Sequence, residues 1–217
     1  MDKKAAKKIS SLLEKNYPNA TTALRHAGAW QLLVATILSA QCTDARVNKV
    51  TPELFIKYRT VKDIASARQP DIEKVIRSTG FYRNKAKNII GAARMLVDVF
   101  GGKVPSTMED LMRLPGVARK TSNIVLFHSF GKNEGIAVDT HVKRVSFRLG
   151  LTRETDPVKI ERDLMDVFDR KKWGDLTNLM IAHGRGVCNA RKPLCCDCPL
   201  AVLCPYAQEI SPELYEN

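Results

Sequence analysis

The apolar positions along the chain repeat at helical spacing and predict a series of short helices. From Tyr82 they recur every three or four residues up to Phe100, and Arg83, Lys85, Lys87 and Arg94 occupy the other faces of that helix. A first amphipathic helix is expected over about residues 2–15, ending at Tyr17-Pro18. The segment AWQLLVATILSAQ is apolar on nearly all sides, which predicts a buried central helix.

Capping residues and prolines predict where further helices begin. These signals are Thr43 or Asp44, Pro52, Ser106 with Glu109 before a short helix up to Leu114, Asp156-Pro157, and Asp175. No stretch alternates apolar and polar residues for long enough to predict a strand, so the expected fold class is all-α. Because the sequence offers no linker or repeat, any division must come from packing, and two helical lobes with a cleft between them are expected.

Length and composition are those of a globular protein. The 217 residues are 44% hydrophobic, which suffices for one large domain or two small ones that share a core. No apolar run is long enough to span a membrane. The N-terminal MDKKAAKKISSLLEKNYP lacks the continuous apolar stretch of a signal peptide, so a cytoplasmic location is expected.

The charge balance favours a nucleic-acid partner. Thirty-five Lys and Arg stand against 23 Asp and Glu, a net charge of +12. An excess of this size suits a phosphate backbone, because each neutralised phosphate releases a counterion. A ribosome-associated or merely basic soluble protein would carry the same charge, so composition alone leaves this alternative open.

The cysteines are gathered near the C-terminus and indicate a metal centre. Cys188, Cys195, Cys198 and Cys204 have the spacing C-x6-C-x2-C-x5-C, and four thiolates suit either tetrahedral zinc or an iron–sulfur cluster. Cys196 would give less usual spacings and is expected to be a bystander. Cys42 is isolated and is expected to be a small buried residue.

The loop NARKPL, between the first two of these cysteines, carries two cations. Metal ligation at both ends would hold Arg191 and Lys192 on a stiff loop that is ready to contact phosphates. A solvated basic loop is the alternative.

The segment LMRLPGVARKTSNIVLF predicts two helices joined by a tight turn. The turn is PGVA, from Pro115 to Ala118, and Arg119 begins the second helix. The backbone N–H groups of such a turn, Gly116 included, lack partners within the chain and can bind a DNA phosphate, helped by the helix dipole. The alternative is an ordinary connection between two helices.

Lys120 and Asp139 are the candidate catalytic pair. Lys120 lies in the first turn of the second hairpin helix, where the field disfavours a cation and favours the neutral amine that a nucleophile needs. Asp139, in IAVDTH, follows that helix and its loop. Lys120 could also be a surface residue, and Asp139 could cap the next helix, a role compatible with catalysis.

The segments LPGVARKTSN, IAVDTHVKRV, LSAQCTDARVNK and the four-cysteine segment together resemble endonuclease III, in that family's order and separations. The resemblance covers nearly the whole chain, from the first helix to Cys204. It implies a [4Fe–4S] cluster on the four cysteines. It also implies a six-helix barrel lobe with a helix-hairpin-helix over about residues 22–132, and a cluster lobe formed by residues 1–21 and 133–217.

The activity implied by the resemblance is that of a bifunctional DNA glycosylase and AP lyase in base excision repair. The enzyme would be a monomer, cytoplasmic and associated with the nucleoid through its DNA. Double-stranded DNA with an oxidised pyrimidine or an abasic site would lie bent across the cleft, with the damaged nucleotide flipped out. Lys120 would be the nucleophile and Asp139 its carboxylate partner, and β-elimination from a Schiff base would nick the strand 3′ to the site.

Other residues match the family by position. Gln41 would fill the space left by the flipped nucleotide, although it could be a polar helix terminus. Asp44 would be a structural carboxylate beside the pocket, or a helix cap. His141 would approach the substrate, or be a satisfied structural group. Phe81 stands where the family usually has an aliphatic wedge; it could stack on the estranged base, or pack as a staple at a helix start.

Ala118 is a second departure, because the hairpin commonly has another glycine there. If that position requires positive φ, alanine costs about 1 kcal/mol.

The closest rival function is that of the adenine glycosylase of mispairs, which Lys120 and the end of the chain at Asn217 disfavour. A thymine-mismatch glycosylase is also disfavoured by Lys120. A non-catalytic DNA-binding module or an electron carrier would need no paired Lys120 and Asp139.

Overall fold

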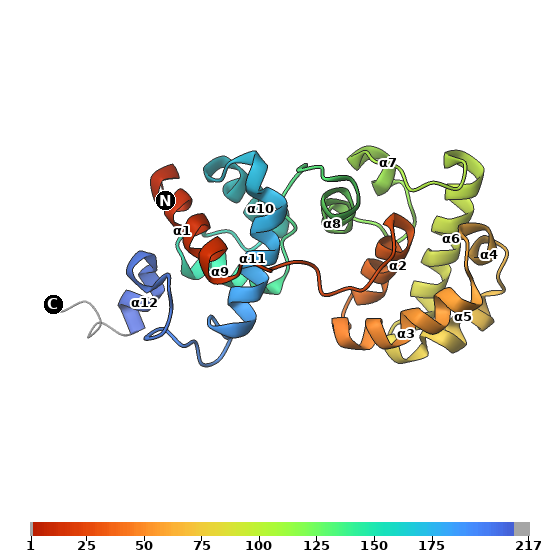
Figure 1. The fold of residues 1–217 in the computed structure, drawn as a ribbon, viewed down its shortest axis with the longest axis horizontal. Helices are drawn as coiled ribbons and strands as arrows, with labels where there is room; N and C mark the ends of the chain where they lie inside the picture. The colour runs from red at the N-terminus through yellow and green to blue at the C-terminus, as the bar shows by residue number, and fades with distance from the viewer. Residues whose placement is uncertain (1, 211–217) are drawn as a thin grey trace. The chain divides into compact units, whose positions relative to one another are not determined.

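The computed structural model describes residues 2–210, which form twelve α-helices and three short 3-10 helices (Figure 1). No strand occurs within this range, so the predicted all-α class is confirmed. The chain divides into two compact units, Thr22–Lys132 and the combination of Met1–Thr21 with Asn133–Asn217. None of the described helices is long and apolar enough to cross a membrane.

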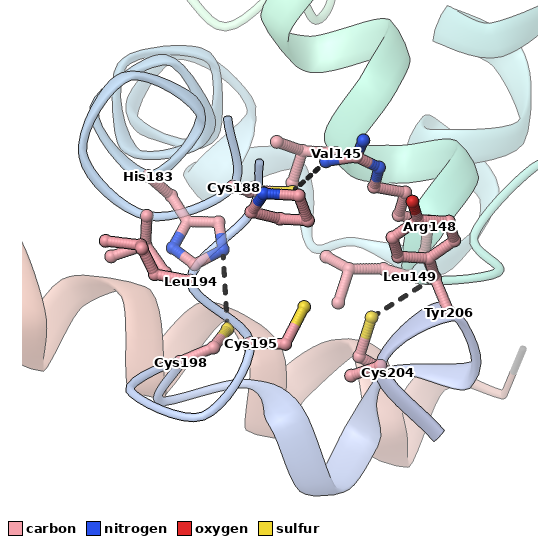
Figure 2. A pocket seen from close by; sticks show the side chains of 13 residues that line it. Val145, Arg148, Leu149, His183, Cys188, Leu194, Cys195, Cys198, Cys204 and Tyr206 are labelled. Atoms are coloured by element: carbon pink, nitrogen blue, oxygen red, sulfur yellow. Dashed lines mark hydrogen bonds between the residues drawn. The ribbon is translucent and has the colours of Figure 1, made fainter. Parts of the chain in front are cut away.

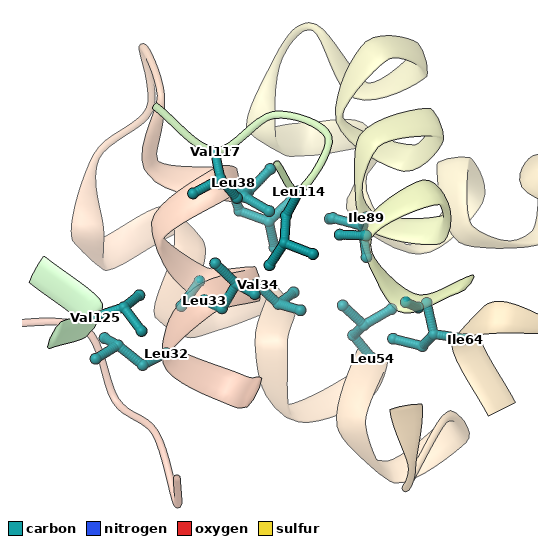
Figure 3. Close-up of a cluster of buried hydrophobic side chains, with 14 of the residues drawn as sticks. Leu32, Leu33, Val34, Leu38, Leu54, Ile64, Ile89, Leu114, Val117 and Val125 are labelled. Carbon is teal, nitrogen blue, oxygen red and sulfur yellow. The ribbon is translucent and has the colours of Figure 1, made fainter. Parts of the chain in front are cut away.

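The unit of residues 22–132 is built around α2, as its all-round apolar sequence predicts. Its helices are α2 (Ala29–Ser39), α3 (Asp44–Lys57), α4 (Val61–Ala65), α5 (Gln69–Ile76), η1 (Arg77–Thr79), α6 (Tyr82–Phe100), α7 (Met108–Met112) and α8 (Arg119–Phe130). Every residue of α2 from Leu32 to Leu38 is buried. Figure 3 shows Leu32, Leu33, Val34 and Leu38 within a cluster that also contains residues of the surrounding helices, Leu54, Ile64, Ile89 and Val125.

This unit holds seven α-helices, one more than the six-helix lobe that the resemblance implies. Two of them, α4 and α7, are only five residues long. Both are opened by a threonine whose hydroxyl accepts a backbone N–H, so a local cap is enough to form a single helical turn.

The second unit joins the N-terminal helix to the C-terminal part of the chain. Its helices are α1 (Lys3–Asn16), α9 (Thr140–Arg148), α10 (Pro157–Val167), η2 (Arg170–Lys172), α11 (Trp173–Gly186), η3 (Ala201–Leu203) and α12 (Pro205–Ile210). Helix α1 is amphipathic, and its buried residues Ile9 and Leu13 belong to the same core as Met180 of α11. This core therefore links segments from the two ends of the described chain.

Of two helix starts predicted in the first half of the chain, the one at Thr43 or Asp44 is confirmed and the one at Pro52 is wrong. Thr43, not Asp44, caps α3, because its hydroxyl accepts the N–H of Arg46 at 3.3 Å. Pro52 does not open a new helix but lies inside α3. Proline lacks an N–H and crowds the carbonyl four residues earlier. The burial of Val47, Thr51 and Leu54 on either side of Pro52 keeps the helix continuous despite that cost.

The predicted capping box was one residue out of register. Thr107 caps α7 and pairs with Asp110, whereas Ser106 accepts hydrogen bonds from the Lys132 ammonium through its carbonyl (2.6 Å) and its hydroxyl (3.1 Å). Both Ser-x-x-Glu and Thr-x-x-Asp satisfy the box pattern, so the sequence alone did not separate them. Helix α10 begins after Asp156 as predicted, but α11 begins at Trp173, two residues before Asp175.

Candidate functional site

The hairpin has the predicted turn, and its strain falls on a single glycine. Gly116 has φ +76°, and a Cβ at this position would lie 2.7 Å from Nδ2 of Asn88. Ala118 has φ −108° and ψ 173°, which is ordinary extended backbone, so alanine carries no conformational penalty there. The predicted set of partnerless N–H groups was too large, because Val117 donates its N–H to the carbonyl of Leu114 at 3.1 Å.

Lys120 is the second residue of α8 and is exposed. The residues of α8 that face the core are Ser122, Asn123, Val125 and Leu126, and Lys120 lies off that face. The first turn of α8 contains no acidic residue, and its N-cap residue, Ala118, has no side chain that could accept a hydrogen bond from it. The amine therefore lies in the first turn of a helix whose positive end is not offset by an acidic residue of that turn or by the N-cap residue.

Asp139 caps α9, and only one of its carboxylate oxygens is used for this. Oδ1 accepts the N–H groups of His141 and Val142, both at 2.8 Å. Oδ2 has no hydrogen-bond partner among residues 2–210. The half-buried carboxylate is thus held rigidly by its cap while one oxygen stays available for another group. Lys120 belongs to the unit of residues 22–132 and Asp139 to the other unit.

His141 is connected through Arg144 to the segment that contains Cys188. Its Nδ1 lies 3.1 Å from Nη2 of Arg144, and because a guanidinium only donates, Nδ1 is the acceptor. Arg144 also donates to the carbonyl of Gly184 at 2.8 Å and to that of Cys188 at 3.0 Å. This arrangement fixes the imidazole ring and leaves its Nε2 as the donor of the neutral form.

Four of the cysteines line one cavity in the second unit. Figure 2 shows Cys188, Cys195, Cys198 and Cys204 around this cavity, which Leu149, His183 and Tyr206 also line. Within the described residues all the cysteines are free thiols, and no three ligand side chains are close enough together to hold a single ion. Cys196 is exposed and does not line the cavity. The four thiols line the wall of the cavity and do not converge on a single ion position.

The electrostatics around the thiols are set by burial and by one arginine. Burial raises the pKa of the Cys198 thiol to about 11 and also raises the pKa of Cys195 and Cys204. A bound metal would therefore have to displace protons from these thiols. Arg148 donates to the sulfur of Cys188 at 3.3 Å and to the carbonyls of Asn189 and Ala190 at 2.7 and 2.9 Å, so it fixes the start of the following loop.

That loop presents two exposed cations. Arg191 and Lys192 are both exposed, and neither has an acidic partner in the part of the chain that the structure describes. The loop is closed by the N–H of Leu194, which donates to the carbonyl of Val187 at 3.0 Å. These hydrogen bonds hold the two ends of the loop, and its stiffness stays a prediction.

Gln41 and Phe81 share an unusual backbone conformation. They are the only non-glycine residues in the described range with positive φ, at 51° and 47°. Phe81 is 65% exposed and is itself the N-cap of α6, so it does not pack as a hydrophobic staple. Gln41 is also exposed and lies two residues beyond the end of α2. Asp44 is the half-buried first residue of α3.

Lys85 was placed on a polar face of α6 by the sequence pattern, and this was wrong. It is only 4% exposed, and its ammonium donates to the carbonyls of Leu38 and Thr79 at 2.8 and 2.7 Å. The sequence did contain a signal: Lys85 precedes the buried Ile89 by four residues and therefore lies on the same face of the helix.

Comparisons with known proteins agree on one family. The sequence model described as "HhH-GPD superfamily base excision DNA repair protein" matches residues 34–170. Endonuclease III of Synechocystis sp. is 57% identical over 206 residues, which cover 95% of this chain and 94% of that protein. Two solved structures, a non-covalent endonuclease III–DNA complex and a trapped covalent endonuclease III–DNA intermediate with an estranged adenine, each have a TM-score of 0.91 and 43% identity, covering 96% of this chain and 98% of theirs.

Proposed function

The chain belongs to the endonuclease III family of base excision DNA repair proteins, and we propose on that premise that Lys120 carries its two activities, removal of oxidised pyrimidines and β-elimination 3′ to the abasic site. The observation that carries this assignment is the exposed Lys120 in the first turn of α8, directly after the Gly116 turn. A solved relative trapped as a covalent DNA intermediate supports a nucleophilic mechanism.

The two activities follow from one amine. The nitrogen of neutral Lys120 attacks C1′ of the deoxyribose, and the electron pair of the C1′–N glycosidic bond leaves with the base, which takes up a proton. Opening of the sugar ring gives a Schiff base between C1′ and Lys120. Loss of a C2′ proton forms the C2′=C3′ double bond and expels the 3′ phosphate with the C3′–O electron pair. Hydrolysis of the imine then frees Lys120.

Asp139 is the second catalytic residue of the proposal. Its Oδ2, which the helix cap leaves unused, supplies negative charge opposite the positive charge that develops on the sugar as the base leaves. The same oxygen can accept the proton that the Lys120 amine loses on attack. The cap fixes the orientation of this carboxylate in advance of the reaction.

We propose that backbone N–H groups and exposed cations bind the DNA phosphates without regard to sequence, and that further exposed side chains contact the bases. The exposed Gly116 and Ala118 lie at the start of α8, where N–H groups and the helix dipole attract a phosphate. Arg191 and Lys192 add two exposed cations. Gln41 and Phe81 are proposed to enter the base stack, with Asp44 and His141 as supporting residues near the damaged nucleotide.

The four cysteines are proposed to hold a [4Fe–4S] cluster. All four thiols line one cavity, and the resemblance of their spacing to that of endonuclease III favours the cluster over tetrahedral zinc. When bound, the cluster would link the segment that follows α11, the loop after Arg191 and the residue that precedes α12 through four cysteine ligands. We also propose that the enzyme is a monomer that acts in the cytoplasm on nucleoid DNA.

The test is borohydride trapping on a duplex with one thymine glycol. Wild type should give a covalent protein–DNA adduct, and Lys120→Gln should give none while it still binds the duplex. Lys103→Gln removes an exposed lysine of the same unit and should trap like wild type. An adduct with Lys120→Gln would assign the nucleophile elsewhere. No adduct with wild type would point to a lysine-independent mismatch glycosylase, or to a binding-only role.

A further inference from the structure

Two exposed residues of the unit 22–132 have a backbone conformation that is unfavourable in free energy. Gln41 has φ 51°, and Phe81 has φ 47° and ψ 26°, both in the left-handed region. For a residue with a Cβ this region costs about 1–2 kcal/mol, and an aromatic ring gains nothing there when it is 65% exposed. Such strain persists only when the surrounding structure imposes it, and it is concentrated at functional positions.

A single buried ammonium connects the two turns. Lys85 donates from Nζ to the carbonyl of Leu38 at 2.8 Å and to the carbonyl of Thr79 at 2.7 Å. Leu38 lies in the last turn of α2, three residues before Gln41. Thr79 ends η1, two residues before Phe81. Two segments about forty residues apart in the sequence are thus fixed to the same nitrogen atom.

The chemistry of these two carbonyls explains why a charged group is buried here. Both stand at helix C-termini, where carbonyls lack partners within the helix and attract a cation. Lys85 is 4% exposed, and burial lowers its pKa while the neighbouring Cys42 raises it. The Lys85 backbone N–H also donates to the carbonyl of Phe81 at 3.1 Å, which is the first helical hydrogen bond of α6.

We propose that Lys85 is a positioning residue, whose ammonium fixes the turns before Gln41 and Phe81 so that both side chains enter the DNA as one preorganised pair. The inference rests on the proposed function, because it takes the opened base stack of a damaged duplex as the place where the pair acts. Fixing both residues before binding removes the ordering cost that two mobile side chains would have to meet on the DNA. Lys85 itself contacts only the protein backbone and needs no contact with the substrate.

The experiment compares Lys85→Met with wild type on duplexes with and without a lesion. Methionine has a similar length and fills the same space, but it cannot donate a hydrogen bond. Affinity for a duplex with a tetrahydrofuran abasic analogue should fall by about tenfold, and affinity for undamaged duplex should stay the same. The signal of 2-aminopurine placed opposite the analogue, which reports disturbance of the estranged base, should weaken in parallel. Lys74→Met, which removes an exposed lysine of α5, should match wild type in both assays.

A double-mutant cycle separates positioning from general stability. If Lys85 acts through Phe81, adding Phe81→Ala to Lys85→Met should cost much less than the sum of the two single losses. Additive losses would overturn the proposal, and so would wild-type affinity and fluorescence in Lys85→Met. Lys85→Gln keeps a neutral hydrogen-bond donor, so it should recover part of the affinity for the abasic-analogue duplex that Lys85→Met loses. If both Lys85 variants are unfolded at the assay temperature, the lysine serves the core instead, and the proposal is wrong.

The proposed function is checked separately in the same preparations. Borohydride trapping of wild type on a preformed abasic site tests the amine chemistry without any demand on Gln41 or Phe81. If wild type traps but the Lys85 variants recognise lesions normally, only the positioning role fails. If wild type does not trap, the failure lies with the proposed function.

Discussion

Asp139 combines two tasks in one side chain, because Oδ1 caps α9 while Oδ2 has no hydrogen-bond partner among the described residues. Asp139→Asn keeps an oxygen for the cap but removes the negative charge. We expect the rate of base release to fall by about 100-fold or more, with only a small change in the thermal midpoint. Single-turnover kinetics and thermal unfolding measure the two effects.

A matched control for this prediction is Asp156→Asn. Asp156 caps α10 in the same way, with bonds of 3.0 Å from Val158 and Lys159. Its amide variant should have a similarly small effect on stability and none on the rate. Near-normal turnover by Asp139→Asn would remove the carboxylate from the mechanism, whereas equal rate losses in both variants would mean that capping alone matters.

Single residues were predictable where their role is written in their immediate neighbours. The turn before Lys120 and the helix after Asp139 are local features, and the structure contains both. The spacing to Ile89 puts Lys85 on the buried face of α6, but the partners of its ammonium could not be predicted, because α2 and η1 bring the two carbonyls from other parts of the chain. The strain at Gln41 and Phe81 was equally invisible, since neither residue type usually adopts positive φ.

At the scale of elements, the hairpin depends on one glycine. Gly116→Ala would place a Cβ at φ +76° and 2.7 Å from Nδ2 of Asn88, so the turn must change shape. We expect a loss of at least about 1 kcal/mol in the free energy of unfolding. Affinity for undamaged duplex should also fall by about tenfold, which corresponds to about 1.4 kcal/mol. Denaturant unfolding and fluorescence anisotropy measure the two losses.

Ala118→Gly is the control for the hairpin. Since Ala118 already has φ −108°, glycine relieves no strain there, and its greater flexibility costs less than about 1 kcal/mol. Duplex affinity should remain that of wild type. A gain in affinity for Ala118→Gly would mean that the second glycine usual in this family improves phosphate binding. Wild-type affinity for Gly116→Ala would separate the turn from DNA binding.

Helix starts were predicted well where one local signal was strong, which was the periodic apolar pattern from Tyr82 for α6 and the Asp156-Pro157 cap for α10. The boundaries failed where two neighbouring residues offered the same local chemistry. Ser106 and Thr107 each begin a sequence that fits a capping box. In the structure Thr107 is the cap, and Ser106 accepts hydrogen bonds from Lys132 instead. Pro52 was predicted to start a helix because its local penalty is large, and packing on both sides of it overrides that penalty.

At the scale of the whole molecule, the proposed cluster ties together segments that no disulfide joins within the described residues. Cys198→Ser removes a proposed ligand from the cavity wall, whereas Cys196→Ser changes an exposed thiol outside it. We expect Cys198→Ser to lose iron and acid-labile sulfide and to unfold at a lower temperature. Cys196→Ser should keep both the cluster and the thermal midpoint. A wild-type protein that contains one zinc ion and no sulfide would contradict the cluster.

The number of phosphates that the protein neutralises sets how its affinity for DNA responds to salt. The exposed cations of the loop at Arg191 allow that response to be divided among single residues. Arg191→Ala removes one cation from the phosphate backbone, so it should lower the slope of log affinity against log salt by about one and weaken binding similarly for all sequences. Lys192→Ala should act in the same way, and the slope of the double variant should fall by about two, because the two cations neutralise separate phosphates. Lys74→Met removes a cation of α5, outside this loop, and should keep the wild-type slope. A weakening confined to one sequence would mean that Arg191 reads a base, since a phosphate carries no sequence information.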